Sequence, residues 1–125
     1  MSDLPRKSQF LIYQSENGAI KIDVRFEDET VWLTQQLMAE LFQTSKQNIG
    51  QHLKNIFEKG ELTQEAVVKN FFTTAADGKN YSAKFYDLDA IISVGYRVKS
   101  RVATQFRVWP ARKMERRYRR TGGTQ

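Results

Sequence analysis

The segment TQQLMAELFQTSKQNIGQHLK, residues 34–54, contains two apolar patterns separated by a short polar break. In each pattern the apolar residues fall on one face of a helix. They are Leu37, Met38, Leu41 and Phe42 in the first, and Ile49 and Leu53 in the second, which continues beyond the segment to Ile56 and Phe57. Thr34 and Ser45 precede the two patterns, and their hydroxyls can cap the first turn of a helix. The segment therefore predicts helices over 35–42 and 46–57 with a tight connection between them.

This spacing is typical of a helix-turn-helix between Thr34 and Phe57. A small residue is needed where the two helices cross, and Ala39 supplies it. A branched apolar residue ten positions later, Ile49, can hold the second helix. Gln43 stands where such turns often have glycine, which weakens the pattern without excluding it, because other residues can adopt that backbone conformation at modest cost. A pair of amphipathic helices in an ordinary helical protein is the alternative.

The helix 46–57 would read the major groove of DNA. Glutamine can pair with adenine, lysine can reach guanine or a phosphate, and a serine at a helix N-terminus suits a phosphate. The predicted DNA-binding residues are Ser45, Lys46, Gln47, Gln51 and Lys54, together with Lys84. Gly50 lies among them, and either close approach to DNA or packing inside the protein would explain a glycine there.

The flanking sequence predicts an α+β fold. Alternating apolar residues predict strands over 10–13 and 20–26, joined in a hairpin by Asn17-Gly18, and a third strand over 30–33. A second hairpin, 70–74 and 81–86, surrounds Asp77-Gly78. It could be a wing that brings Lys79 and Lys84 to DNA, or a structural hairpin over the core. A short helix or an irregular connection is expected over 63–69. Further helices are expected after Asp87, with Leu88, Ile91, Ile92 and Gly95 or Tyr96 inward, and over 101–109.

The net charge of +6 is concentrated at one end of the chain. From Arg97 onward there are ten basic residues and one acid, a charge of +9, so residues 1–96 carry −3. Clustered arginine and lysine suit a polyanion such as DNA, although a solvated basic helix or a solubilising tail is the alternative. We expect a domain over residues 1–110 and a basic, flexible tail over 111–125.

Several classes of function are disfavoured by composition. The chain has no cysteine and one histidine, His52, which has no carboxylate at productive spacing. Asp87 and Asp89 are better explained as helix-capping acids, and Glu27-Asp28-Glu29 as a solvated bend. We therefore expect neither enzymatic activity nor a cofactor or metal. No signal peptide or membrane span is apparent, so we expect a cytoplasmic, nucleoid-associated protein.

Five stretches resemble the RhuM family of bacterial proteins: EDETVWLTQ at 27–35, MAELF at 38–42, Asn48-Ile49, FYDLDAIISVGYRV at 85–98 and TQFRVW at 104–109. The resemblance extends over about Ile12 to Trp109. It implies a DNA-binding protein associated with virulence or a mobile island. RhuM-like chains usually continue further, and Pro110 with the arginine-rich tail breaks the helix expected after Trp109, so we expect a truncated or rearranged copy.

Residues 106–109 (FRVW) and 117–122 (RYRRTG) are also similar to the end of the Bro-N domain of phage antirepressors. Together the resemblances imply a regulator of a prophage or genomic island that binds double-stranded DNA as a homodimer. The alternative is an antirepressor-like module that binds another regulator protein through exposed aromatic residues. A nuclease is a more distant hypothesis.

Overall fold

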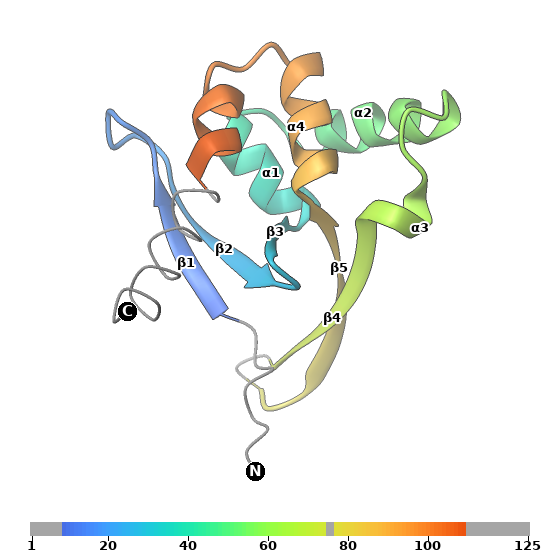
Figure 1. The fold of residues 1–125 in the computed structure, drawn as a ribbon. Helices are drawn as coiled ribbons and strands as arrows, with labels where there is room; N and C mark the ends of the chain where they lie inside the picture. Colours follow the sequence, from blue (N-terminus) through green and yellow to red (C-terminus); the bar gives the residue numbers. More distant parts are fainter. Residues whose placement is uncertain (1–8, 75–76, 110–125) are drawn as a thin grey trace, which may run out of the picture.

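The computed structural model describes residues 9–74 and 77–109. Its five strands form one antiparallel sheet in the order β1-β2-β3-β5-β4 (Figure 1). Their bounds are β1 Gln9–Gln14, β2 Lys21–Glu27, β3 Thr30–Leu33, β4 Val68–Thr74 and β5 Asn80–Asp87. The predicted α+β class and both predicted hairpins are confirmed.

Four labelled helices accompany the sheet: α1 Gln35–Phe42, α2 Lys46–Glu58, α3 Gln64–Val67 and α4 Leu88–Arg97. Residues 102–109 form a further helix. Figure 1 shows α1, α4 and this last helix gathered on one side of the sheet. α1 and α4 contact the strands, whereas α2 packs mainly on α1 and α4. The second predicted helix of the pair therefore lies in an outer layer.

The main core lies between the sheet and these helices. On β2, Ile22 and Val24 point into it and are 5% and 0% exposed, because alternate residues of a strand face the same side. Val31 and Leu33 of β3 face the same way and are fully buried. Apolar burial of this kind is the main favourable term that orders the domain. The largest fully buried side chains include Phe106, Leu33, Met38, Leu41, Ile49, Ile56 and Ile91.

A smaller aromatic cluster occupies the other face of the sheet. Trp32, Phe71 and Phe85 bury one another there, with edge-to-face ring contacts at centroid distances of 5.3–5.4 Å. The guanidinium of Arg25 lies 3.9 Å from the centre of the Phe71 ring. Arg25 is only 8% exposed, and burial lowers its pKa from the ordinary value. The charged side chain of Arg25 thus packs against this second, aromatic cluster.

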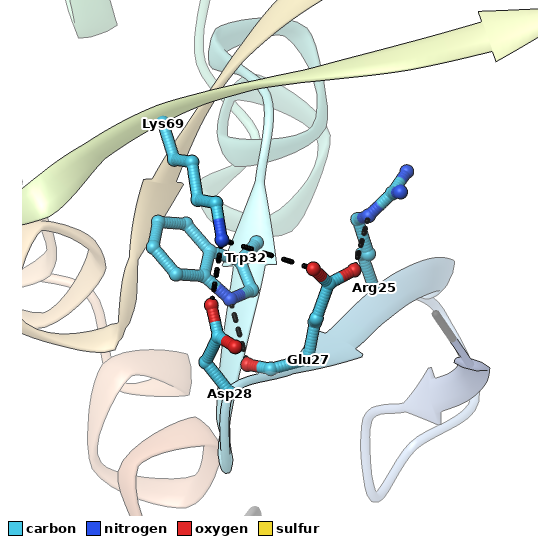
Figure 2. A network of polar contacts seen from close by, with 5 residues as sticks. All are labelled: Arg25, Glu27, Asp28, Trp32 and Lys69. Carbon is cyan, nitrogen blue, oxygen red and sulfur yellow. Dashed lines mark hydrogen bonds and ion pairs between the residues drawn. The ribbon is translucent and has the colours of Figure 1, made fainter. Parts of the chain in front are cut away.

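Lys69 links β4 to the turn between β2 and β3 (Figure 2). Its Nζ lies 2.7 Å from Asp28 and 3.8 Å from Glu27, and the hydrogen bond to Asp28 raises the pKa of Lys69. Trp32 Nε1 donates to the Glu27 carbonyl oxygen at 2.9 Å. Asp28 and Glu29 both have positive φ, of 57° and 60°, in a two-residue turn between paired Glu27 and Thr30. The predicted solvated bend is therefore a tight turn tied to β4.

One local expectation needs correction, and one alternative is decided. The helix expected over 63–69 spans only Gln64–Val67, because Val68 and Lys69 pair with Tyr86 and Phe85 and so extend the β4–β5 hairpin. On α4, Gly95 is the inward residue of the two predicted alternatives, since it is buried while Tyr96 is 61% exposed. Ala90, Ile91, Val94 and Gly95 are the buried residues of this helix, while Leu88 and Ile92 are partly buried.

Candidate nucleic-acid interface

Both predicted caps of the helix pair are present. Leu37 N donates to Thr34 Oγ1 at 3.1 Å, and Asn48 N donates to Ser45 Oγ at 3.0 Å. Gln43 ends α1 in the left-handed conformation, with φ 55° and ψ 52°, as expected where glycine is common. Gln43, Thr44 and Ser45 alone therefore connect α1 to α2.

The packing between the two helices uses the predicted positions. Ala39 is 2% exposed and Ile49 is fully buried, with Leu53 and Ile56 continuing the same buried side of α2. Thr44 N donates to the Ala39 carbonyl oxygen at 2.9 Å, which fastens the connection to the end of α1. The buried side of α2 is thus held, and its opposite side is left for solvent or a ligand.

Three of the predicted residues form what we call the α2 polar face: Gln47, Gln51 and Lys54. They are all exposed, and their i, i+4, i+7 spacing places them on one side of the helix. Gln51 Nε2 contacts Asn55 Oδ1 at 3.4 Å, a weak hydrogen bond that leaves the glutamine available. Ser45 is exposed at the start of α2, although its Oγ already accepts the capping hydrogen bond.

Gly50 does not belong to this face. It is partly buried, and a Cβ built on it would lie 2.7 Å from Gln35 Nε2. That Gln35 nitrogen donates to the Lys46 carbonyl oxygen at 3.0 Å. The glycine is therefore explained by packing, because the Gln35 side chain crosses α2 at this point. The explanation by close approach to DNA stays a prediction.

Lys46 and Lys84 lie in one surface hollow, although they are 38 positions apart in the sequence. The hollow has a volume of about 490 Å³ and is lined by Thr34, Gln35, Gln36, Lys46, Ala83, Lys84 and Tyr86. These lining residues include two lysines and no carboxylate. Burial raises the pKa of Tyr86, so its hydroxyl remains a neutral donor at physiological pH. We call this site the lysine hollow.

Sequence reasoning missed the residues of the first helix that line the lysine hollow. Gln36 is exposed at the first turn of α1, next to the predicted Lys46. The signal was available, since the first helix of a helix-turn-helix crosses the DNA backbone in known complexes. The pairing with Lys84 had no local signal, because it depends on β5 lying beside the two helix starts.

The β4–β5 hairpin is part of the sheet, since β5 also pairs with β3 through Trp32–Asp87 and Leu33–Tyr86. Lys84 of this hairpin faces the helices, whereas Lys79 lies in the turn at its far end and is not among the residues that line the lysine hollow. The hairpin thus covers the core and also contributes one cation to the candidate interface.

The basic C-terminal region is only partly described. Arg97 donates to Glu61 at 2.6 Å, and Arg107 donates to the Tyr96 hydroxyl at 3.1 Å, so these two cations have partners within the chain. Lys99 and Arg101 are exposed. The predicted tail over 111–125, and Pro110 before it, lie outside the described residues.

The acidic residues considered at the sequence level have structural roles. Asp87 accepts from Ala90 N at 3.2 Å and caps α4, and desolvation raises its pKa to about 6. Asp28 is paired with Lys69. Within residues 9–74 and 77–109, no group of three or more His, Cys, Asp or Glu side chains is placed to hold a metal ion. In the same residues, no helix is long and apolar enough to cross a membrane.

Part of the chain matches a known protein family. Residues 66–122 match the model of the Virulence protein RhuM family, which confirms the predicted resemblance over the stretches at 85–98 and 104–109. The matched range includes β4, β5 and α4, and hence Lys84, but α1 and α2 precede it. The comparisons with curated proteins and with solved structures gave no match. The resemblance to Bro-N domains stays a prediction.

Proposed function

We propose that α1 and α2 act as a helix-turn-helix that binds double-stranded DNA, with the α2 polar face in the major groove. The observation that carries the proposal is the lysine hollow. It brings the starts of α1 and α2 and one strand of the second hairpin to a single cationic surface beside that face. A DNA backbone running past the groove-bound helix would meet Lys46 and Lys84 there.

The roles within this surface follow from side-chain chemistry. Gln47 and Gln51 can each make two hydrogen bonds to an adenine edge, and Lys54 can reach guanine or a phosphate. Lys46, Lys84 and the exposed Ser45 would contact phosphates, which position the protein without reading sequence. Gln36 would add an amide donor from the first turn of α1. The activity is binding and regulation rather than catalysis.

The similarity to a virulence-associated family suggests the biological setting. A DNA-binding protein of this size would act as a transcriptional regulator of a prophage or genomic island, in the cytoplasm at the nucleoid. It would bind as a homodimer, because paired half-sites multiply the affinity of a single module.

A second candidate is an antirepressor-like module that binds another regulator protein. Exposed aromatic side chains favour it, since Phe10, Phe72 and Tyr96 are 58%, 76% and 61% exposed. Ionic strength separates the two candidates: DNA affinity falls steeply with salt, whereas an apolar protein interface does not weaken in this way.

The test is a fluorescence-anisotropy titration of labelled duplex DNA with the full chain over a range of salt concentrations. Each phosphate contact contributes about 0.9 to the slope of log affinity against log salt. We expect the double variant Lys46→Ala/Lys84→Ala to bind more weakly and to lower this slope by about 1.8. Lys59→Ala is the control for each of the two single variants, because it removes the same charge from an exposed residue at the opposite end of α2.

Three outcomes would count against the proposal. No binding at any salt concentration removes DNA as the ligand and leaves the protein-interaction module. Binding with an unchanged slope in the double variant moves the contact away from the lysine hollow, to the C-terminal basic residues. Cleavage of the DNA in the presence of divalent metal would replace binding with nuclease activity.

A further inference from the structure

The face of β2 that points away from α1 and α4 carries a stripe of alternating charge, which is exposed at Lys21 and Asp23 and largely buried at Arg25. Its residues are Lys21, Asp23, Arg25 and Glu27, which point away from the core because Ile22, Val24 and the partly buried Phe26 point into it. Positive and negative side chains therefore follow one another at intervals of about 6.7 Å along the strand. The four side chains together carry no net charge.

An apolar stripe on the edge strand β1 lies beside the charged one. Phe10 and Ile12 are 58% and 55% exposed, and they are paired with Arg25 and Asp23 respectively in the β1–β2 register. β1 contains no charged residue and no proline in Gln9–Gln14, the devices that commonly keep edge strands from associating. Two exposed apolar side chains thus lie on the first strand of the sheet, beside the charged stripe of β2.

Arg25 has an unmet requirement for an acceptor. Its closest carboxylate contact joins Nε to Glu27 Oε1 at 3.7 Å, and within the described residues Nε has no hydrogen-bond partner. Its two terminal nitrogens point away from the other residues drawn in Figure 2. This largely buried guanidinium, which lies over the Phe71 ring, therefore keeps donors that no acceptor within the described residues satisfies at hydrogen-bond distance, and that is unfavourable because arginine stays charged. Asp23, two residues away on the same face, is exposed and takes part in no ion pair among the described residues.

Both stripes are complementary to themselves under a two-fold rotation. When the β1–β2 faces of two protomers lie against each other, a two-fold axis can run between the two sheets at right angles to the strands, at the level of Val24 and Leu11. Rotation about this axis reverses the direction of the partner's strands. It sets Arg25 opposite the partner's Asp23, and Lys21 opposite the partner's Glu27. The same axis sets Phe10 opposite the partner's Ile12, because Phe10 is paired with Arg25 and Ile12 with Asp23 in the β1–β2 register. An interface with two-fold symmetry requires this kind of self-complementarity.

We propose that the β1–β2 face is the interface of a homodimer, in which Arg25 of each protomer binds Asp23 of the other and the Phe10–Ile12 stripes pack together. The pairing of neutral stripes allows two chains of net charge +6 to associate. α2 packs on the far side of α1 and α4, so both α2 polar faces stay free in the dimer. We expect a dissociation constant in roughly the micromolar range.

The first test is sedimentation equilibrium of the full chain, without DNA, over a range of protein concentrations. The wild-type protein is expected to pass from monomer to dimer. Asp23→Arg sets like charges against the partner's Arg25 and should weaken the dimer by about tenfold or more. Glu65→Arg is the control, because it makes the same change in net charge at an exposed residue of α3. A monomer at every concentration, or an equal effect of both variants, would overturn the proposal.

The second test locates the interface by cross-linking. The chain has no cysteine, so a short bismaleimide linker reacts only where one is introduced. Ile12→Cys should give covalent dimers, because the two copies of this position lie on either side of the axis. Tyr96→Cys, equally exposed but on α4, should not. Dimers from Tyr96→Cys alone would place the interface elsewhere. Both tests omit DNA, so their failure is separate from a failure of the proposed DNA binding.

Discussion

The contact between Gln35 and Gly50 leads to a prediction about a double-mutant cycle. Replacing glycine by alanine inside a helix usually stabilises it by about 1 kcal/mol. Here the new Cβ would lie 2.7 Å from Gln35 Nε2 and would displace that side chain from the Lys46 carbonyl oxygen. A hydrogen bond of this kind contributes about 1 kcal/mol. The two effects therefore offset each other, and Gly50→Ala should change the free energy of unfolding by less than about 0.5 kcal/mol.

The same substitution should behave differently once Gln35 is shortened. In the Gln35→Ala background nothing opposes the added methyl group, so Gly50→Ala should stabilise the protein by about 1 kcal/mol. The coupling energy of the cycle is then about 1 kcal/mol, which is within the range measured for contacting residues. Urea unfolding of the wild-type protein, both single variants and the double variant, followed by far-UV circular dichroism, measures it.

Two results would refute this explanation of Gly50. A full stabilisation of about 1 kcal/mol in the wild-type background would show that Gln35 does not occupy the space. A loss of DNA affinity of about tenfold or more in folded Gly50→Ala would indicate that the glycine serves close approach to DNA instead. We expect the variant to retain DNA affinity, since the new methyl group points toward Gln35.

Three further predictions concern stability. Burial raises the pKa of Asp87 to about 6, so its contribution to stability is present below about pH 3.8 and is lost as the pH rises through 6. Asp87→Asn keeps a capping acceptor, and its free energy of unfolding at pH 8 should exceed that of the wild type by on the order of 1–3 kcal/mol. Thermal unfolding should show no such gain at pH 3.5. Gln43→Gly relieves a left-handed residue and should raise the melting temperature by about 3–5 °C; a lower value would contradict the αL assignment. Gly95→Ala would place a Cβ 2.5 Å from the Cβ of Ala103 and should destabilise the protein by about 1–3 kcal/mol. Urea unfolding measures this change, and an unchanged midpoint would refute the packing of Gly95 against Ala103.

Features that depend on a few neighbouring residues could be predicted from the sequence. The caps of Thr34, Ser45 and Asp87 each accept a hydrogen bond from an amide three residues later, so the local sequence determines them. Asn17-Gly18 marked the first hairpin for the same reason, since Ala19 N donates to Asn17 Oδ1 at 2.9 Å and Gly18 has a φ of 74°. Helical periodicity likewise placed the α2 polar face on the correct side.

The sequence by itself therefore determined the strands, most of the helices, the caps and the α2 polar face, because their interactions act over a few residues. The tertiary structure decided what depends on distant segments. It converted Val68 and Lys69 from helix to strand by pairing them with β5. It buried Arg25 against Phe71 of β4, and it brought Lys84 to Lys46. The sequence around Arg25 does not indicate which aromatic ring will cover it, and the sequence around Lys46 does not indicate that Lys84 will lie nearby. Both contacts depend on the order of strands in the sheet.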